Sequence, residues 1–343
     1  MVQPKKSIRQ HDIKLTVFSC QPDEASLFLR YAMQYGVDLS LSDQPVSAEN
    51  AVQAAGSQCI SVSHTVPITA SILNALHDIG VRYISTRSIG CDHIDTLHAE
   101  KIGILVSNVS YSPDSVADYT LMLMLMASRR MKSILRHSDA QNYDLQGMCG
   151  RELRSLTVGV AGTGHIGGAV IDRLSGFGCH ILAYDVYPNA DLMPFATYVD
   201  LDTLLAQSDI LTLHMPATDA THHIINRQSL ARMKCDAVLI NTSRGSLVDS
   251  LALIDAIERG HLGGAALDVI EDEAGLYYRD LQDKPVPNRA LALLKAFPNV
   301  ILTPHTAFYT DRAVEGMVEN SIKNCLRFEN QSAARFLKAE NCL

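Results

Sequence analysis

The chain has 343 residues, of which 47% are hydrophobic and 19% charged, with a formal net charge of −8 and a sequence pI near 5.9. This length exceeds the usual size of a single hydrophobic core, so we expect two domains in a globular protein. The acidic balance argues against nucleic acid or an anionic membrane surface as a partner.

The cysteines and the apolar runs indicate the cellular compartment. The 8 cysteines are scattered and form no Cys-x-x-Cys pair, which favours a reducing environment over a disulfide framework. The amino-terminal stretch lacks the uninterrupted apolar region of a signal peptide. The most apolar run, residues 119–127, is far shorter than the roughly 20 residues of a membrane span. We therefore expect a cytoplasmic protein without a membrane partner.

The first hundred residues alternate between strand-like and helix-like segments. The clearest helix is predicted over residues 69–79, with Gly80 as its C-cap. Alternation of this kind predicts a parallel sheet with helices on both faces. No glycine-rich phosphate loop occurs in this region, so it is not the expected nucleotide-binding domain. The predicted strands are residues 13–18, 37–41, 58–62, 81–85 and 104–107.

A long helix is predicted to begin at Ser112. Pro113 fits the first turn, where its missing N–H costs nothing, and Asp114 and Asp118 suit the positive end of the helix dipole.

A glycine fingerprint follows this helix. Residues 156–161 read as a buried strand that runs into Gly162-Thr163-Gly164-His165-Ile166-Gly167, then a helix, then a second strand over 179–184 that ends at Asp185. The first glycine permits a tight turn, the second admits a pyrophosphate, and the third lets helix and strand pack closely. Asp185 can accept hydrogen bonds from ribose hydroxyls. Because strand, glycines, helix, strand and acid occur in this order, we predict that the chain binds a dinucleotide.

The β/α alternation then resumes to the end of the second domain. An amphipathic stretch at 313–329 lies beyond the last strand and can return to the first domain. We therefore predict a discontinuous domain of residues 1–111 and 308–343 and a dinucleotide-binding domain of residues 112–307. The predicted strands are 210–214, 237–241, 264–269 and 300–303, and the predicted helices are 201–207, 228–233 and 251–259.

Three of these strands end in residues that can do chemistry. Arg244 follows one strand, Asp268 and Glu273 lie at and after another, and His305 follows a third. In an open α/β sheet, ligands bind beyond the carboxyl ends of the strands. A guanidinium can hold a carboxylate and polarise a carbonyl. An imidazolium can deliver a proton, and a carboxylate behind the ring can stabilise it. The set suits hydride transfer to a 2-keto acid.

Each of these residues also has a structural interpretation when taken alone. Arg244 can cap a loop, Asp268 can form a turn, and His305 can be an ordinary loop residue. Their joint placement in a dinucleotide-binding unit favours the catalytic interpretation.

Other polar clusters are given structural interpretations. We interpret Glu271 and Asp272 as a solvated acidic cluster, and His222-His223 as a surface turn without a partner. No zinc-ligand spacing occurs around His93 and His98, so we expect no metal site.

At this point the chain resembles the D-specific 2-hydroxyacid dehydrogenases, and within them the D-lactate dehydrogenases, most closely those of the vancomycin-resistance type. The resemblance covers nearly the whole chain. The stretches that carry it are the glycine fingerprint and residues 83–90, 111–118, 241–245, 267–273 and 304–309.

The resemblance implies a role for each matching residue. Arg244 would bind the substrate carboxylate and carbonyl, His305 would be the acid/base, Glu273 its carboxylate partner, and Asp268 would tune the site. The family fold implies two flavodoxin-like or Rossmann-like domains with the active site in the cleft, in a homodimer. The resemblance also assigns substrate binding to Ile89, Gly90, Tyr111 and Phe308, and cofactor binding to His214, Met215, Pro216, Thr242, Ser243, Arg244 and Asp268.

Asp185 bears on the choice of cofactor. Its carboxylate should repel a 2′-phosphate, and the following residues offer no Arg to compensate, so we expect NADH rather than NADPH. The expected reaction is reduction of pyruvate and other short 2-keto acids to the D-2-hydroxy acid.

Two other functions stay open. One is a broad D-2-hydroxyisocaproate-type dehydrogenase for larger keto acids, and the other is a non-enzymatic NAD(H)-sensing corepressor of the same fold. Glu273 disfavours the formate dehydrogenase branch, which has Gln there. The chain ends at Leu343 without an additional domain, which disfavours phosphoglycerate dehydrogenases with a regulatory tail.

Overall fold

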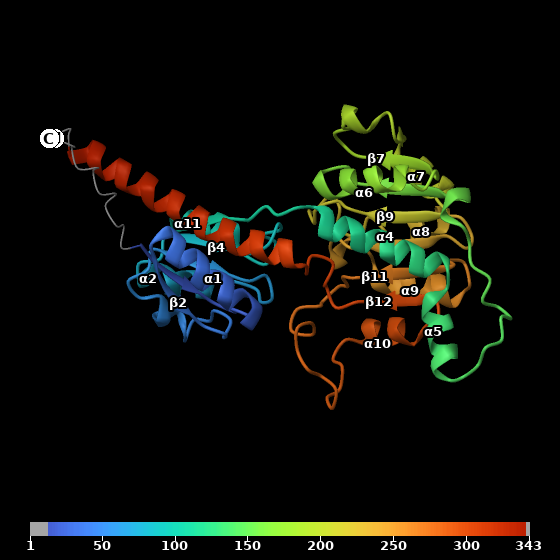
Figure 1. Ribbon diagram of the computed structural model, residues 1–343, viewed down its shortest axis with the longest axis horizontal. Coiled ribbons are helices and arrows are strands. Elements are labelled where there is room, and N and C mark those ends of the chain that lie inside the picture. Colours follow the sequence, from blue (N-terminus) through green and yellow to red (C-terminus); the bar gives the residue numbers. More distant parts are fainter. Residues whose placement is uncertain (1–12, 341–343) are drawn as a thin grey trace, which may run out of the picture. The chain divides into compact units, whose positions relative to one another are not determined.

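The chain forms two compact units (Figure 1). The computed structural model describes residues 13–340, with side chains as far as residue 330, so the amino-terminal stretch considered for a signal peptide lies outside the described residues. Unit 1 comprises Met1–Ser112 and Thr310–Leu343, and unit 2 comprises Pro113–Tyr309. These bounds lie within two residues of the domain bounds expected from the sequence.

Unit 1 is built on a parallel sheet in the strand order β2-β1-β3-β4-β5. This order places the first strand between the second and the third, as in flavodoxin-like doubly wound folds. The strands are β1 (Ile13–Val17), β2 (Val37–Leu41), β3 (Cys59–Val62), β4 (Tyr83–Thr86) and β5 (Leu105–Ser107), and the α-helices are α1 (Pro22–Tyr35), α2 (Ala70–Asp78), α3 (Thr96–Lys101) and α11 (Asp311–Glu340).

The unit 1 sheet is covered on both faces. One hydrophobic cluster includes Leu73 of α2 and Ala99 of α3. The other includes Phe28 of α1 together with Val318 and Ile322 of α11. The last helix of the chain therefore completes the core of the unit that the first hundred residues begin.

Unit 2 contains a seven-stranded parallel sheet in the order β12-β11-β10-β9-β6-β7-β8. Its strands are β6 (Thr157–Ala161), β7 (His180–Tyr184), β8 (Thr197–Tyr198), β9 (Ile210–Leu213), β10 (Val238–Asn241), β11 (Gly264–Leu267) and β12 (Val300–Leu302). Its α-helices are α4 (Asp114–Ser128), α5 (Met131–Asp139), α6 (His165–Ser175), α7 (Leu201–Gln207), α8 (Arg227–Arg232), α9 (Ser250–Glu258) and α10 (Arg289–Ala296).

Helices also cover both faces of the unit 2 sheet. Leu123 of α4 and Leu174 of α6 belong to one buried cluster, and Leu204 of α7, Leu230 of α8 and Leu253 of α9 belong to the other. The expected fold class, two doubly wound parallel α/β sheets, is confirmed.

Most element ends differ from the expected ones by one or two residues, but α11 extends to Glu340, eleven residues beyond its expected end. Helix α2 ends at Asp78 with Ile79 as the C-cap residue, so Gly80 lies one residue beyond the position expected for it. Gly80 has a φ of 102°, which a residue with a Cβ rarely adopts, and this explains the glycine. Strand β8 was not expected, because its two residues are too few to show an alternating pattern.

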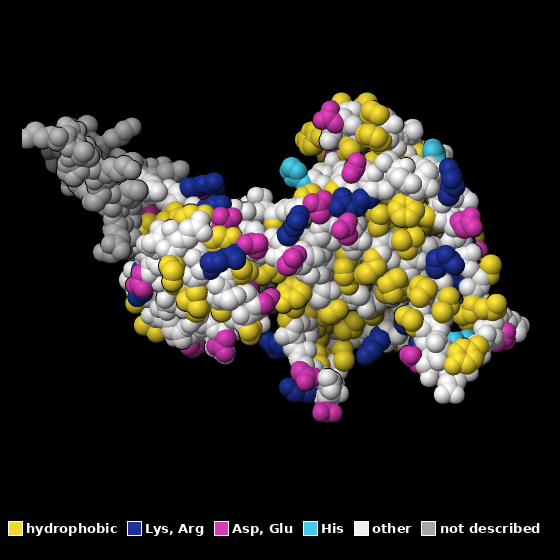
Figure 2. All heavy atoms as spheres, viewed as in Figure 1, with side chains coloured by type: hydrophobic (Ala, Val, Ile, Leu, Met, Phe, Trp, Pro, Cys, Tyr) yellow, Lys and Arg dark blue, Asp and Glu magenta, His cyan; other side chains and the backbone are white. Residues whose placement is uncertain are grey.

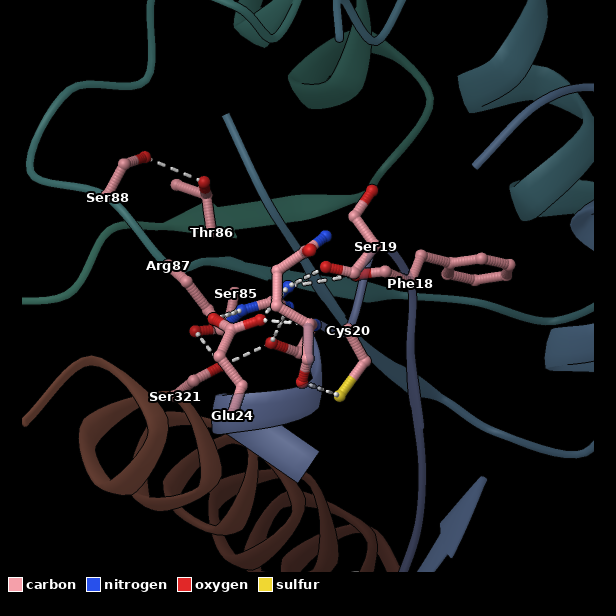
Figure 3. A network of polar contacts seen from close by, with 11 residues as sticks. Phe18, Ser19, Cys20, Glu24, Ser85, Thr86, Arg87, Ser88 and Ser321 are labelled. Carbon is pink, nitrogen blue, oxygen red and sulfur yellow. Dashed lines mark hydrogen bonds and ion pairs between the residues drawn. The ribbon is translucent and has the colours of Figure 1, made fainter. Parts of the chain in front are cut away.

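A buried ion pair joins three strands and a helix of unit 1 (Figure 3). The side chain of Arg87, just after β4, is 1% exposed. Its Nε lies 2.8 Å from Oε1 of Glu24 in α1, and its Nη1 donates to the Ser61 hydroxyl of β3 at 3.0 Å. Its Nη2 donates to the carbonyls of Phe18 and Ser19, after β1, at 3.0 and 3.1 Å. Because every contact is shielded from water, the pair fixes the carboxyl ends of these strands.

An exposed apolar face lies on unit 2. Figure 2 shows hydrophobic side chains gathered over α4 and α6. Met122 and Leu125 of α4 and Phe177 after α6 line a hollow of about 770 Å³ there.

Among the described residues, no helix has both the length and the apolar character needed to cross a bilayer.

Removing one partner of the buried pair should destabilise unit 1. Glu24→Ala would leave the Arg87 guanidinium buried without its counter-charge, which costs about 3–5 kcal/mol. The matched control is Arg30→Ala on the same helix, whose partner Glu315 is solvent-exposed, and the expected cost there is about 0–1 kcal/mol. Urea unfolding monitored by circular dichroism measures both. Equal losses in the two variants would contradict the role given to the buried pair.

Candidate active site

The glycine loop connects β6 to α6, and its glycines serve different needs. Gly162 has a φ of 91°, and a Cβ added to it would lie 2.7 Å from the backbone carbon of His214. A Cβ on Gly167 would lie 1.9 Å from the carbonyl oxygen of Gly162. A Cβ on Gly164 would meet no atom within 4 Å. The fold itself therefore requires the first and third glycines, and the second keeps the surface of the loop low for a ligand.

The first turn of α6 follows this loop. Gly164 is the N-cap residue, His165 and Ile166 begin the helix, and His165 is exposed. The N–H groups in the first turn of a helix have no intrahelical acceptor, and they carry the positive end of the helix dipole. The loop and the helix together form a cradle for phosphate groups.

Asp185 follows β7 and is held against the glycine loop. Its Oδ2 accepts hydrogen bonds from the backbone N–H of Thr163 at 2.6 Å and from the Thr163 hydroxyl at 3.1 Å. Its Oδ1 accepts from the backbone N–H of Tyr187 at 2.9 Å. The Tyr198 hydroxyl donates to the Thr163 hydroxyl at 2.9 Å. The contacts of Thr163 and Tyr198 were not predicted from the sequence. Thr163 could have been recognised from its place inside the glycine fingerprint, whereas no local sequence pattern marks Tyr198.

His214 follows β9, which ends at Leu213, one residue earlier than expected. Its backbone lies against Gly162, and its Nε2 lies 2.9 Å from the Thr212 hydroxyl. Burial lowers the pKa of His214 to about 3, so the ring is neutral near pH 7. Its Nδ1 is buried and has no hydrogen-bond partner among the described residues. Met215 follows and is buried, whereas Pro216 is exposed.

The end of β10 lies beside the end of β9. Ser243 donates through its hydroxyl to the carbonyl of Met215 at 2.6 Å, and the hydroxyls of Thr242 and Thr120 lie 2.8 Å apart. The predicted cofactor residues of the two strand ends are thus tied together. These features fit a dinucleotide. The open space above Gly164 admits phosphate groups, the buried His214 Nδ1 is available for a hydrogen bond, and the Asp185 carboxylate can accept one.

Arg244 is brought next to the end of β11 by the glycine that follows it. A Cβ on Gly245 would lie 2.0 Å from the carbonyl carbon of Ile270, so only glycine permits this approach of the two backbones. The Arg244 Nη1 donates to the carbonyl of Ser243 at 2.9 Å, and the side chain is partly exposed. The guanidinium is therefore presented at the rim of the sheet.

Asp268 is fully buried and organises the segment that carries His305. Its Oδ1 accepts from the Thr303 hydroxyl at 2.6 Å and from the Thr306 N–H at 2.9 Å, and its Oδ2 accepts from the Ala307 N–H at 2.9 Å. Its carbonyl accepts from the His305 N–H at 2.7 Å. The geometry makes Asp268 a positioning residue for His305.

His305 and Glu273 form a close hydrogen-bonded pair. The His305 Nδ1 lies 2.5 Å from Oε1 of Glu273, and Oε2 of Glu273 accepts from the Ile270 N–H at 3.0 Å. The Tyr278 hydroxyl donates to the His305 carbonyl at 2.7 Å, and the Phe308 ring stands edge-on to the imidazole at 6.2 Å. Glu273 and Phe308 contact the ring, with Nδ1 committed to the carboxylate, and Tyr278 holds the backbone of His305. Tyr278 was missed by sequence reasoning and has no motif to reveal it.

The interpretation of Glu271 as a solvated acid is wrong. Its Oε1 lies 2.5 Å from Nε2 of His223, and its Oε2 accepts from the Ser250 N–H at the start of α9 at 2.8 Å. Partial burial raises the pKa of Glu271, but the hydrogen bonds from His223 and Ser250 outweigh it and hold the pKa below its ordinary value. His223 therefore has a partner 48 residues away, which sequence spacing could not show. Asp272 is exposed, as expected.

His222 lies beside this pair, and within residues 13–330, whose side chains are described, these three are the one group of His, Cys, Asp or Glu whose atoms are close enough to share a metal ion. Both Glu271 oxygens are already engaged by the protein. We therefore interpret the cluster as a helix cap.

The other predicted substrate residues lie in unit 1. The Ile89 carbonyl accepts from Nδ2 of Asn108 at 2.7 Å, and the Gly90 carbonyl accepts from the Ser88 hydroxyl at 2.7 Å. Tyr111 lies against Gly316 of α11. Their assignment to the substrate stays a prediction.

Residues 121–307 match the family described as D-isomer specific 2-hydroxyacid dehydrogenase, NAD binding domain. The chain is 51% identical over 321 residues to a D-specific alpha-keto acid dehydrogenase of Enterococcus faecium, with coverage of 94% of this chain and 98% of that one. It is similar to the crystal structure of a D-lactate dehydrogenase from Treponema pallidum, with a TM-score of 0.83, 33% identity and coverage of 93% and 97%. The structure of a D-2-hydroxyisocaproate dehydrogenase also has a TM-score of 0.83, with 33% identity and coverage of 93% and 98%.

The glycine loop gives a test that separates folding from binding. Gly164→Ala should fold with the melting temperature of the wild type, because its Cβ meets open space, but should bind NADH much more weakly, because the methyl group occupies the cradle. Gly167→Ala should lower the melting temperature, because its Cβ collides with the Gly162 carbonyl. Differential scanning fluorimetry and NADH fluorescence titration measure the two effects. Wild-type NADH affinity in Gly164→Ala would contradict the cradle.

Proposed function

Because the chain belongs to the D-isomer specific 2-hydroxyacid dehydrogenase family, whose members are NAD-dependent oxidoreductases, we propose that it reduces pyruvate and other short 2-keto acids to the D-2-hydroxy acids with NADH. The observation that carries the proposal is the Glu273–His305 pair at the rim of the unit 2 sheet, near the turn that presents Arg244. This set supplies an anion-binding group, a proton donor and a charge that stabilises the donor.

Arg244 binds the substrate in this proposal. Its guanidinium pairs with the substrate carboxylate and polarises the 2-keto carbonyl, since its planar fork matches both oxygens. Bound NADH would supply the hydride to the carbonyl carbon.

His305 supplies the proton. Glu273 holds Nδ1, so Nε2 is the nitrogen that donates to the carbonyl oxygen as the alcohol forms. The Glu273 carboxylate stabilises the imidazolium that reduction consumes. In the reverse direction, the neutral ring accepts the proton of the hydroxy acid through the same nitrogen.

The preference for NADH is part of the proposal. Asp185 lies where the adenosine ribose would bind, and its charge disfavours a 2′-phosphate.

The homodimer, the cytoplasmic location and a place in vancomycin resistance stay predictions. The apolar face over α4 and α6 supports a homodimer, because exposed patches of this kind commonly mark protein contacts.

Turnover and product chirality test the proposed reaction. Purified protein with pyruvate and NADH should give D-lactate, measured by chiral chromatography and by the loss of NADH absorbance. A higher kcat/KM for 2-ketoisocaproate than for pyruvate would favour the D-2-hydroxyisocaproate-type alternative. L-lactate as the main product would reject the proposal, and binding of NADH without turnover of any 2-keto acid would favour the corepressor.

The pH profile tests the role of Glu273. Reduction requires the imidazolium, so its rate falls at high pH. Glu273→Gln removes the charge that stabilises this form, and the fall should begin at lower pH than in the wild type. His305→Ala should lower kcat by about 10²–10⁴-fold, because the proton donor is lost.

NADH affinity, measured by fluorescence, should be largely retained in both variants, since the phosphates rest on the glycine loop. A Glu273→Gln profile that coincides with the wild-type profile would remove Glu273 from the mechanism.

A further inference from the structure

A directed chain of hydrogen bonds ends on Asp185. The backbone N–H of Asn189 donates to the Tyr198 hydroxyl at 3.0 Å, this hydroxyl donates to the Thr163 hydroxyl at 2.9 Å, and the Thr163 hydroxyl donates to Oδ2 of Asp185 at 3.1 Å. An N–H can only donate and a carboxylate can only accept, so the two hydroxyl protons between them have one consistent direction. This hydrogen-bond chain therefore directs the Thr163 hydroxyl proton toward the Asp185 carboxylate.

The sheet brings together the residues of this hydrogen-bond chain. Strand β8 pairs with β7 through Tyr198 and Ala183, two residues before Asp185. Thr163 is 3% exposed, within the glycine loop. The backbone N–H groups of Thr163 and Tyr187 bind one carboxylate oxygen each. Asp185 is thus held at both oxygens and cannot rotate without breaking hydrogen bonds.

This fixation bears on the choice between two cofactors. A carboxylate accepts hydrogen bonds from ribose hydroxyls, whereas a 2′-phosphate brings negative charge and acceptor oxygens to the same position. A loosely held carboxylate could turn away from the phosphate and reduce the repulsion. We propose that Tyr198, acting through Thr163, is a positioning residue that determines specificity for NADH over NADPH by holding Asp185 in place. The inference rests on the proposed NADH preference and deepens it.

The experiment measures the dissociation constants of NADH and NADPH by fluorescence titration, without substrate. Tyr198→Phe keeps the ring and removes the hydroxyl. Loss of one such hydrogen bond should weaken NADH binding about two- to tenfold and leave NADPH binding unchanged or tighter, so the preference for NADH falls by at least that factor. Tyr143→Phe, at a tyrosine that is 77% exposed and lies outside the glycine loop and its hydrogen-bond chain, is the control and should change neither constant.

A double-mutant cycle shows whether Tyr198 acts through Asp185. In the Asp185→Ser background the carboxylate is absent, so adding Tyr198→Phe should leave the ratio of the two constants unchanged. A further fall in the ratio there would mean that Tyr198 acts on the cofactor by another route, and would overturn the inference.

The remaining outcomes are also decisive. Equal weakening of both cofactors by Tyr198→Phe would assign Tyr198 a structural role only. A wild type that binds NADPH as tightly as NADH would overturn the proposed preference and the inference with it, whereas a selective wild type with an unchanged Tyr198→Phe ratio would overturn the inference alone. If Tyr198→Phe does not fold, Thr163→Val removes the next hydroxyl of the chain, and an unchanged ratio in that variant would overturn the inference.

Discussion

The candidate active site depends on the burial of one carboxylate. Asp268 is removed from water and accepts three hydrogen bonds from the segment 303–307, so the cost of burying its charge is offset only while that segment keeps its shape. His305 lies inside this segment with a φ of 51°, a conformation that a non-glycine residue rarely adopts. The carboxylate stabilises the unusual backbone, and the backbone aims the imidazole at Glu273.

Glu271 and Glu273 are two residues apart and do different work. The first divides its oxygens between His223 and the start of α9, and the second divides its oxygens between His305 and the Ile270 N–H. Each carboxylate is therefore fixed by a backbone N–H on one oxygen and an imidazole on the other. The same carboxylate–imidazole pairing caps a helix at Glu271 and forms the proposed acid/base pair at Glu273.

The sequence was most informative where the backbone itself constrains the residue type. The glycine fingerprint is readable because Gly162 and Gly167 are required by contacts within a few residues or by an adjacent strand. The placement of Arg244, Glu273 and His305 at one rim could be predicted because parallel strands end at a common edge of the sheet, whereas their roles stay a prediction. The pairs of Arg87 with Glu24 and of His223 with Glu271 could not, since each joins residues far apart that no local pattern connects. Tyr198 and Tyr278 were missed for the same reason: a hydroxyl gains its role only from tertiary neighbours.

The placement of α11 in unit 1 has a consequence for the order in which the protein is made. Val318, Ile322 and Cys325 complete a hydrophobic cluster whose other buried members are in the first hundred residues of the chain. A ribosome must therefore synthesise all of unit 2 before the core of unit 1 can close. Unit 2 is continuous, and domains generally fold as units during synthesis. The nascent chain should thus acquire its dinucleotide-binding half first, while the half that emerges earlier has one sheet face covered only by α1 until α11 has been synthesised.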